Sequence, residues 1–176
     1  MVKLNAKQLR NQESRIKNHA KRNEIYIILD NVLDTYNIGA IFRLADAVAA
    51  KKVILCGGSE TPPNHRIKKA SINTTEVVDW SYSESALEAA RNLKSKISNL
   101  KLIAIEQNEK SVPYDQYDYS MPIALVVGHE SDGVSKEVLE LCDGIVELPM
   151  FGVNISLNVM VSLGIILYKI LEKTAL

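Results

Sequence analysis

Asparagine and arginine stand six residues apart in the segment DNVLDTYNIGAIFRLADA, residues 30–47, as Asn37 and Arg43. Asn37 is a favoured residue for capping the helix that the following residues predict, and Arg43 is of a type common on exposed helix faces. Arg43 nevertheless has apolar neighbours, and an arginine in such surroundings is typical of a site with an anionic partner. A phosphate suits the planar guanidinium. The segment therefore predicts either a capped surface helix or a phosphate contact.

A second polar segment, VVGHESDGVS at residues 126–135, holds the carboxylate of Glu130 between Gly128 and Gly133. Glycines at these places let the backbone come close to a ligand. A plain strand-to-helix turn capped by Ser135 explains the glycines equally well, but it does not account for the carboxylate. The sequence contains no GxGxxG or Walker pattern, so it does not predict the usual phosphate cradle of a nucleotide-binding protein.

The third segment, ELPMFGVNISLNVMVSLGIILYKI at residues 147–170, leads from a polar loop into an apolar helix. Ser156 and Asn158 stand at the junction, where both would serve as caps of the helix start. The apolar run from Val159 to Ile170 is about half of the ~20 residues that a bilayer span needs. We therefore expect a buried helix and no membrane partner.

Short β-branched runs alternate with helical stretches along the rest of the chain, which indicates an α/β fold with a parallel sheet. The predicted strands are residues 25–29, 52–56, 76–79, 101–106, 123–128 and 145–148, and the predicted helices are residues 38–49, 83–97, 135–141 and 155–171. The Gly/Pro-rich stretch 57–66 is predicted to be an exposed loop. Each polar segment follows the carboxyl end of a predicted strand, where open α/β sheets bind ligands.

In order and spacing, NIGAIFR, VVGHESDGVS and ELPMFGVNISLNVMVSLGI resemble the three signature motifs of the SpoU (TrmH-like) RNA 2'-O-ribose methyltransferases of the SPOUT superfamily. The resemblance runs from about Ile25 to the carboxyl end. It implies a mostly parallel sheet flanked by helices with a C-terminal trefoil knot, although knots are nearly absent from folds in general. It also implies a homodimer packed through the knot surfaces, and S-adenosylmethionine as a methyl donor wrapped by the loop before the apolar helix, with no metal.

The resemblance assigns roles to residues of the three motifs position by position. The catalytic set is Asn37, Arg43, Glu130, Ser156 and Asn158. The cofactor contacts are Gly128, Glu130, Gly133, Leu148, Met150, Ser156 and Leu157. Because arginine keeps its proton at neutral pH, we prefer Arg43 as a clamp on the phosphate beside the target ribose over Arg43 as the base, and the sequence leaves both roles open. His129 departs from the family pattern, since many relatives have asparagine there.

Residues 1–22 are predicted to form a basic helical arm on a methyltransferase domain of residues 23–176. The arm holds seven basic residues and one acidic residue, a net charge of +6, whereas the remaining 154 residues hold 14 basic and 20 acidic ones, a net charge of −6. Clustered positive charge is typical of a contact with a nucleic-acid backbone, although a solvated terminal helix would have the same composition. The predicted RNA-binding residues are Lys3, Lys7, Arg10, Arg15, Lys17, Lys21 and Arg22.

Composition bounds the class of protein. With 47% hydrophobic and 24% charged residues among 176, the chain is predicted to form one globular domain beside the arm. Two cysteines without paired spacing and an amino terminus without an apolar signal region indicate a cytoplasmic protein. Three scattered histidines predict no metal site.

Among RNA substrates, tRNA is favoured, with a D-loop guanosine as the first hypothesis. The reason lies in the resemblance, because the chain lacks the large amino-terminal domain of the ribosomal-RNA members and has an arm that the smallest members lack. Ribosomal RNA is the alternative. Two other classes stay open: a non-catalytic RNA-binding module of the same fold, and a flavodoxin-like nucleotide binder, which would need a glycine-rich loop after the first strand.

Overall fold

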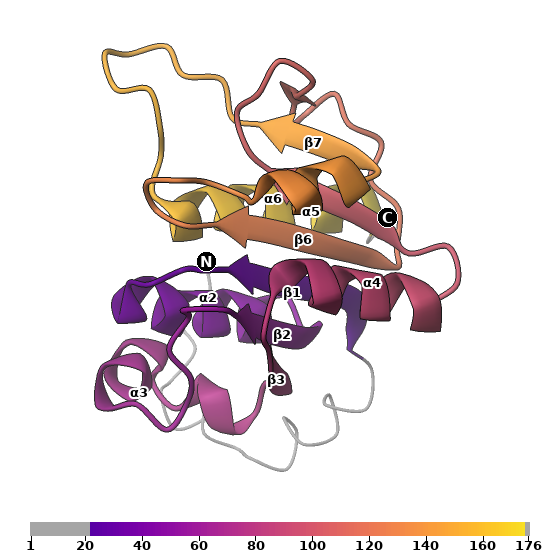
Figure 1. Ribbon diagram of the computed structural model, residues 1–176. Helices are drawn as coiled ribbons and strands as arrows, with labels where there is room; N and C mark the ends of the chain where they lie inside the picture. Colours follow the sequence, from indigo (N-terminus) through magenta and orange to yellow (C-terminus); the bar gives the residue numbers. More distant parts are fainter. Residues whose placement is uncertain (1–21, 175–176) are drawn as a thin grey trace, which may run out of the picture.

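The computed structural model describes residues 22–174, within which seven parallel strands form one sheet in the order β3-β2-β1-β6-β4-β7-β5 (Figure 1). The strands are β1 (Asn23–Asp30), β2 (Ala50–Cys56), β3 (Trp80–Ser83), β4 (Lys101–Ile105), β5 (Val112–Pro113), β6 (Ile123–Gly128) and β7 (Gly144–Glu147). The helices are α2 (Thr35–Ala47), α3 (His65–Ser71), α4 (Ala86–Lys96), α5 (Lys136–Leu141) and α6 (Val159–Thr174), with a 3₁₀ turn η1 (Thr74–Glu76). The predicted α/β class and parallel sheet are confirmed, and the trefoil knot stays a prediction.

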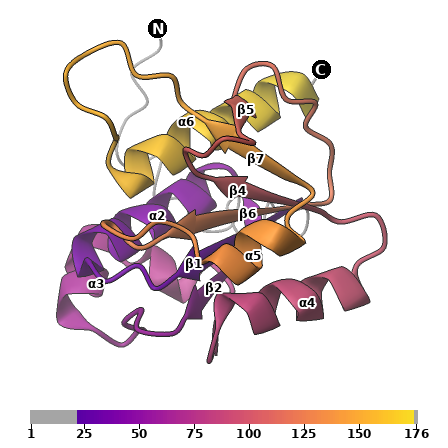
Figure 2. The same ribbon diagram turned by 45° about the horizontal axis from the view of Figure 1, so that its top comes forward.

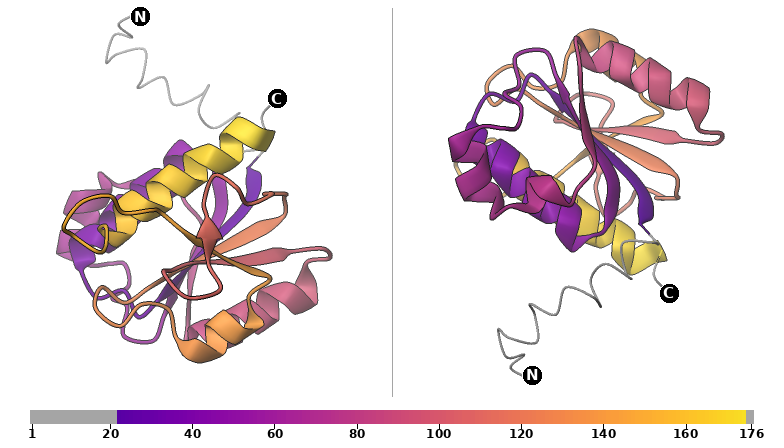
Figure 3. Two further views of the ribbon diagram at one scale, coloured as in Figure 1. Left: turned by 90° about the horizontal axis from the view of Figure 1, so that it is seen from above. Right: turned by 90° about the horizontal axis from the view of Figure 1, so that it is seen from below.

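Helices cover both faces of the sheet. Figure 3 shows α2, α3 and α6 on one face and α4 and α5 on the other. One buried cluster includes Phe42 of α2 and Leu163 of α6, and a second includes Ala89 of α4 and Val138 of α5. The central strand β6 is buried along its whole length, as its continuous apolar run predicts. No helix of residues 22–174 has the length and apolar character needed to cross a membrane.

Two close contacts hold α2 between α3 and α6 (Figure 2). A Cβ atom on Gly39 would lie 2.5 Å from the Cβ atom of Ala70, so only glycine allows α2 and α3 to approach this closely. On the other side, a Cβ atom on Gly164 of α6 would lie 3.3 Å from Leu44. The helix that carries Asn37 and Arg43 is therefore fixed from both sides.

Several predicted bounds are wrong. The strand predicted at residues 76–79 is the end of η1 and a turn, and the strand next to β2 is β3, residues 80–83. Helix α3 begins inside the stretch predicted to be a loop, and β5 was not predicted, because elements of seven and two residues are too short to show a periodic pattern. Helices α4 and α6 begin three and four residues later than predicted, after Ser85 and Asn158.

Candidate active site

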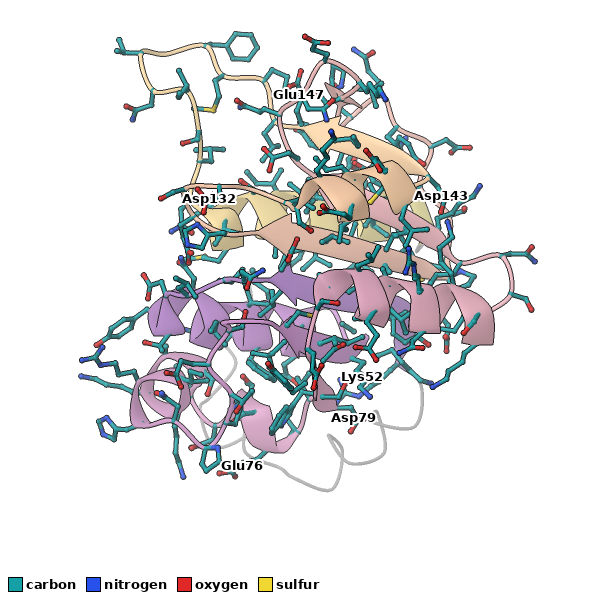
Figure 4. All side chains as sticks on the ribbon, in the orientation of Figure 1. Lys52, Glu76, Asp79, Asp132, Asp143 and Glu147 are labelled. Atoms are coloured by element: carbon teal, nitrogen blue, oxygen red, sulfur yellow. The ribbon has the colours of Figure 1, made fainter. Side chains whose placement is uncertain are left out.

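A cavity of about 460 Å³ opens at the carboxyl ends of β4, β6 and β7. Because the strands are parallel, these ends lie at one edge of the sheet and bring the second and third polar segments together. Figure 4 shows Asp132 and Glu147 at this edge, with Asp143 at the opposite one. All seven residues predicted to contact the cofactor line the cavity: Gly128, Glu130, Gly133, Leu148, Met150, Ser156 and Leu157.

A chain of hydrogen bonds joins the three polar segments beside this cavity. The side-chain amide of Asn37 donates to Glu130 Oε1 at 3.1 Å, and the amide of Asn158 donates to Asn37 Oδ1 at 3.0 Å. Asn37 is 6% exposed, so its amide is held by both partners in a largely dry setting. Ser156 lines the same cavity. Four of the five residues predicted to be catalytic thus lie at one place.

Glu130 ties the loop after β6 to the start of α2. Its carboxylate accepts hydrogen bonds from the backbone N–H groups of Leu33 and Asp34, at 3.2 and 3.1 Å, besides that from Asn37. Partial burial by itself raises the pKa of Glu130, but the hydrogen bonds from Asn37 and from the backbone outweigh it and lower this pKa below the ordinary value. Glu130 is therefore a carboxylate at neutral pH, and most of its hydrogen bonds hold Asn37 and the start of α2 in place.

The prediction that Asn37 caps the helix of the first segment is wrong. Asp34 caps α2, accepting from the N–H of Tyr36 at 2.7 Å, and Asn37 lies inside the first turn with its side chain toward Glu130. Of the two caps predicted for the third segment, Asn158 is confirmed, because its Oδ1 accepts from the N–H of Met160 at 3.0 Å. Asn158 therefore both starts α6 and bonds Asn37. The prediction for Ser156 is wrong, because α6 begins at Val159 and Ser156 stands two residues before its cap.

Arg43 lies apart from these residues. It stands six residues after Asn37, about 9 Å farther along the helix axis, and its side chain is exposed. Within residues 22–174 its guanidinium forms no ion pair or hydrogen bond, and Arg43 does not line the cavity. In this chain taken alone, Arg43 is a surface charge, and any contact with a phosphate has to come from the bound substrate.

Two carboxylates that the sequence analysis did not select hold the loop of residues 128–135. Asp30 Oδ2, at the end of β1, accepts from the N–H of Ser135 at 2.8 Å. Glu106 Oε2, just after β4, accepts from the N–H of Val134 at 2.9 Å. Each is an acidic residue at the carboxyl end of a parallel strand, and this position is the sequence feature by which they could have been found. Ser135 precedes α5, but its own side chain makes no capping bond.

The two glycines of this loop allow its arms to approach each other. A Cβ atom on Gly128 would lie 2.1 Å from the carbonyl carbon of Gly133, and Gly133 has a φ of +70°. His129 closes the turn between them, because its Nδ1 atom accepts from the N–H groups of Ser131 and Asp132 at 3.1 and 3.2 Å. The Oδ1 atom of an asparagine stands at the same place in its side chain and would accept the same bonds.

The loop between β7 and α6 stands out from the body of the molecule (Figures 1 and 4). Its apolar side chains are nearly bare: Phe151 is 97% exposed, Val153 99% and Ile155 81%. Several exposed apolar side chains on one segment are typical of a surface that contacts a ligand or a partner.

The cavity fits S-adenosylmethionine, whose sulfonium and ammonium groups are cationic and whose adenine has flat faces that pack against apolar side chains. Glu106, Glu130 and Glu147 line it, and Leu148 and Leu157 supply apolar surface. Its volume is in the range of small-molecule sites, about 300–1,000 Å³. No group of three or more metal-ligating side chains occurs in the part of the chain that the structure describes.

Comparison with known proteins agrees with this geometry. The model of the SpoU rRNA Methylase family matches residues 24–168. The chain belongs to the SpoU family. Among the curated SpoU relatives, it is 33% identical over 153 residues to the tRNA (guanosine(18)-2'-O)-methyltransferase of Aquifex aeolicus, covering 85% of this chain and 69% of that protein. It is 31% identical over 145 residues to the 23S rRNA (guanosine-2'-O-)-methyltransferase of Ralstonia nicotianae, covering 82% of this chain and 57% of that one.

Solved SpoU structures share the fold. The A. aeolicus TrmH/SpoU tRNA modifying enzyme aligns with a TM-score of 0.81 and 27% identity over 93% of this chain and 84% of that chain. An AdoMet-bound rRNA methyltransferase from Sinorhizobium meliloti aligns with a TM-score of 0.79 and 26% identity over 88% and 58% of the two chains. The chain spans little more than half the length of several of these relatives.

Of the basic arm, Arg22 alone falls within the described residues. Its guanidinium donates to the carbonyl oxygen of Ala50 at 3.0 Å and to that of Val77. The other predicted RNA contacts, Lys3, Lys7, Arg10, Arg15, Lys17 and Lys21, lie outside the described residues. The division of the chain into arm and domain stays a prediction.

Proposed function

We propose that this protein transfers the methyl group of S-adenosylmethionine to the 2'-hydroxyl of a ribose in RNA. The observation that carries the proposal is the hydrogen-bonded chain of Glu130, Asn37 and Asn158 beside a cavity lined by every residue assigned to the cofactor. The SpoU relatives named as tRNA and 23S rRNA 2'-O-methyltransferases support it.

Bound in the cavity, S-adenosylmethionine supplies a methyl group on a positively charged sulfur, and the reaction also removes one proton from the ribose hydroxyl. The cavity carboxylates Glu106 and Glu147 favour the cationic donor. The amides of Asn37 and Asn158 hold each other in one orientation and so fix the place where the ribose lies, which is the main contribution a protein makes to an in-line transfer. Glu130 holds Asn37 rather than taking the proton, because three N–H groups already bond its carboxylate.

Arg43 is proposed to bind the phosphate next to the target ribose and to lower the free energy of the developing alkoxide through its charge, while that phosphate accepts the proton that the ribose hydroxyl loses. The alternative, in which Arg43 takes the proton itself, is disfavoured by the chemistry of the guanidinium. The exposed position of Arg43 is compatible with the phosphate contact, since the substrate provides the partner that the chain itself does not.

A homodimer with the C-terminal trefoil knot of SPOUT proteins at its interface is part of the proposal. It is supported by the exposed apolar residues of α6, Val161, Ile165 and Tyr168, which are 38%, 37% and 56% exposed. The bare loop before α6 would be covered by the same contact. We place the protein in the cytoplasm, where RNA substrates occur.

The proposed substrate is tRNA, with a D-loop guanosine first, and ribosomal RNA is the second candidate. The test is to incubate the protein with methyl-labelled S-adenosylmethionine and, separately, unmodified bulk tRNA and unmodified ribosomal RNA. Label in tRNA alone supports the proposal, and label in ribosomal RNA alone moves the substrate to the second candidate. Binding of RNA without label in either would favour a non-catalytic RNA-binding module.

A further inference from the structure

A second, more open cavity, of about 520 Å³, lies at the carboxyl end of β2 and along the edge strand β3. The carboxyl end of β2 is on the same edge of the sheet as the candidate active site. It is lined by residues 57–61 and by two aromatic side chains, Trp80 and Tyr82. Neither ring belongs to the three motifs, and nothing in the methyl-transfer chemistry described above uses them.

The two rings present a fixed aromatic surface. Trp80 and Tyr82 are two residues apart on one strand, so their side chains lie on the same face of it. Trp80 is half-buried against the core, whereas Tyr82 is 50% exposed and its hydroxyl donates to the carbonyl oxygen of Gly57 at 3.0 Å. A ring that is held by its hydroxyl and bare on its surface is typical of a stacking platform for a planar ligand.

The floor of this cavity is joined to the active-site loop. Asn31 Oδ1 accepts from the N–H of Gly58 at 2.9 Å, and a Cβ atom on Gly57, whose φ is +58°, would lie 2.3 Å from the same oxygen. The Asn31 side-chain amide donates to Asp30 Oδ1 at 3.0 Å, and the other oxygen of Asp30 accepts from Ser135. One pair of side chains at the end of β1 therefore sets the relative position of the two cavities.

Charge around the second cavity suits a nucleic-acid strand. Helix α3, which begins four residues after Thr61, carries Arg66, Lys68 and Lys69 and no acidic residue. Lys68 pairs with Glu76 at 3.5 Å, whereas Arg66 and Lys69 form no ion pair within residues 22–174. Inside the cavity, the carboxylate of Glu60 is an acceptor for the N–H groups of a base edge.

The separation of the two cavities is also suitable. Strands β2 and β6 are two places apart in the sheet, and β3 and β6 three places, which is about 10 to 14 Å at ~4.8 Å a strand. A short run of unpaired nucleotides spans such a distance. RNA is recognised mainly through unpaired bases that stack on aromatic side chains.

We propose that the cavity of Trp80 and Tyr82 binds an unpaired base of the RNA, near the nucleotide whose ribose is methylated, by stacking on Tyr82 with Trp80 as the inner wall. The inference rests on the proposed function, because it takes RNA as the substrate. Arg66 and Lys69 contact the phosphates of the same stretch.

The chain itself supplies the probe, because Trp80 is its single tryptophan. Titration of the full-length protein with unmodified bulk tRNA should quench tryptophan fluorescence to saturation, whereas titration with S-adenosylmethionine should leave it nearly unchanged. Tyr82→Ala should weaken RNA binding about tenfold or more, since stacking on an aromatic side chain contributes about 1–3 kcal/mol per base. Tyr82→Phe keeps the ring and should retain most of the affinity.

The outcomes separate the two proposals. Methylation of RNA with unquenched fluorescence, or with equal RNA affinity for Tyr82→Ala and the wild type, would overturn the base site and leave the methyltransferase standing. Failure of the wild type to bind or methylate any RNA would overturn both. Thermal unfolding of each variant shows whether a loss of affinity is a loss of fold, and a loss shared equally by Tyr82→Ala and Tyr82→Phe would also refute stacking.

Discussion

Glu106 is predicted to be a positioning residue for the cofactor site, through the loop that it holds. Its carboxylate accepts from the N–H of Val134 at 2.9 Å and from that of Gln107 at 2.8 Å. Val134 is 5% exposed, so Glu106→Ala leaves its N–H group without a partner and nearly without water. An unsatisfied buried donor costs about 1–3 kcal/mol, and we take about 2 kcal/mol because the carboxylate itself is half-buried.

For a domain of this size, about 2 kcal/mol corresponds to a decrease in melting temperature of roughly 4–8 °C. Gly133, one residue earlier, lines the cofactor cavity, so the same change should weaken the binding of S-adenosylmethionine about tenfold. Calorimetric titration gives the affinity, and thermal unfolding gives the stability. Glu106→Gln keeps one acceptor oxygen and should fall between Glu106→Ala and the wild type.

The matched control is Glu140→Ala, which removes an exposed carboxylate from α5. It should melt and bind like the wild type. If Glu106→Ala matched this control in both measurements, the hydrogen bond from Val134 would contribute nothing to the loop and the reasoning would be refuted.

Changes at three further residues test the other groups of the site. His129→Asn should keep cofactor affinity within a few-fold, because the asparagine Oδ1 replaces Nδ1 as the acceptor, whereas His129→Ala should lose most of that affinity. Titration calorimetry measures both, and equal affinities for the two variants would contradict this. The pKa of Glu130 is lowered from its ordinary 4.5, so the stability it contributes is complete above that pH and is lost as pH falls through the lowered value. Melting temperatures of Glu130→Gln should accordingly fall less steeply than those of the wild type between about pH 6 and pH 3, and parallel curves would show that its hydrogen bonds do not stabilise the fold. Arg43→Lys keeps the charge but not the planar fork, so it should bind cofactor normally and lose most methyl transfer; transfer at the wild-type rate would exclude the phosphate clamp.

The elements that the sequence predicts best are those with long apolar runs. The bounds of β6 are those predicted, because IALVVG is a continuous buried strand. The strand predicted at residues 76–79 is wrong because two adjacent valines, Val77 and Val78, are typical of a strand. In the structure both belong to a turn after η1, in which Val77 is 42% exposed and Val78 is buried. Local apolar pairs carry too little information to separate a short strand from a turn.

The candidate site divides in the same way. The motif residues could be selected from the sequence because the resemblance fixes their positions, and four of the five catalytic candidates lie together. The supporting carboxylates could not, because Asp30 and Glu106 bond backbone groups that are 105 and 28 positions away along the chain. Only the order of the strands in the sheet brings those groups together, and the hydrophobic periodicity of the sequence does not predict that order.

The most direct test of the central claim is to locate the transferred methyl group. RNA methylated by the wild-type protein with labelled S-adenosylmethionine is hydrolysed completely in alkali, which cleaves each linkage through the neighbouring free 2'-hydroxyl. Our account predicts that the label appears in alkali-resistant dinucleotides, because a 2'-O-methyl group removes that hydroxyl, and that Asn158→Ala strongly reduces this label with little change in RNA affinity. Label recovered in mononucleotides would place the methyl group on a base and would contradict the account.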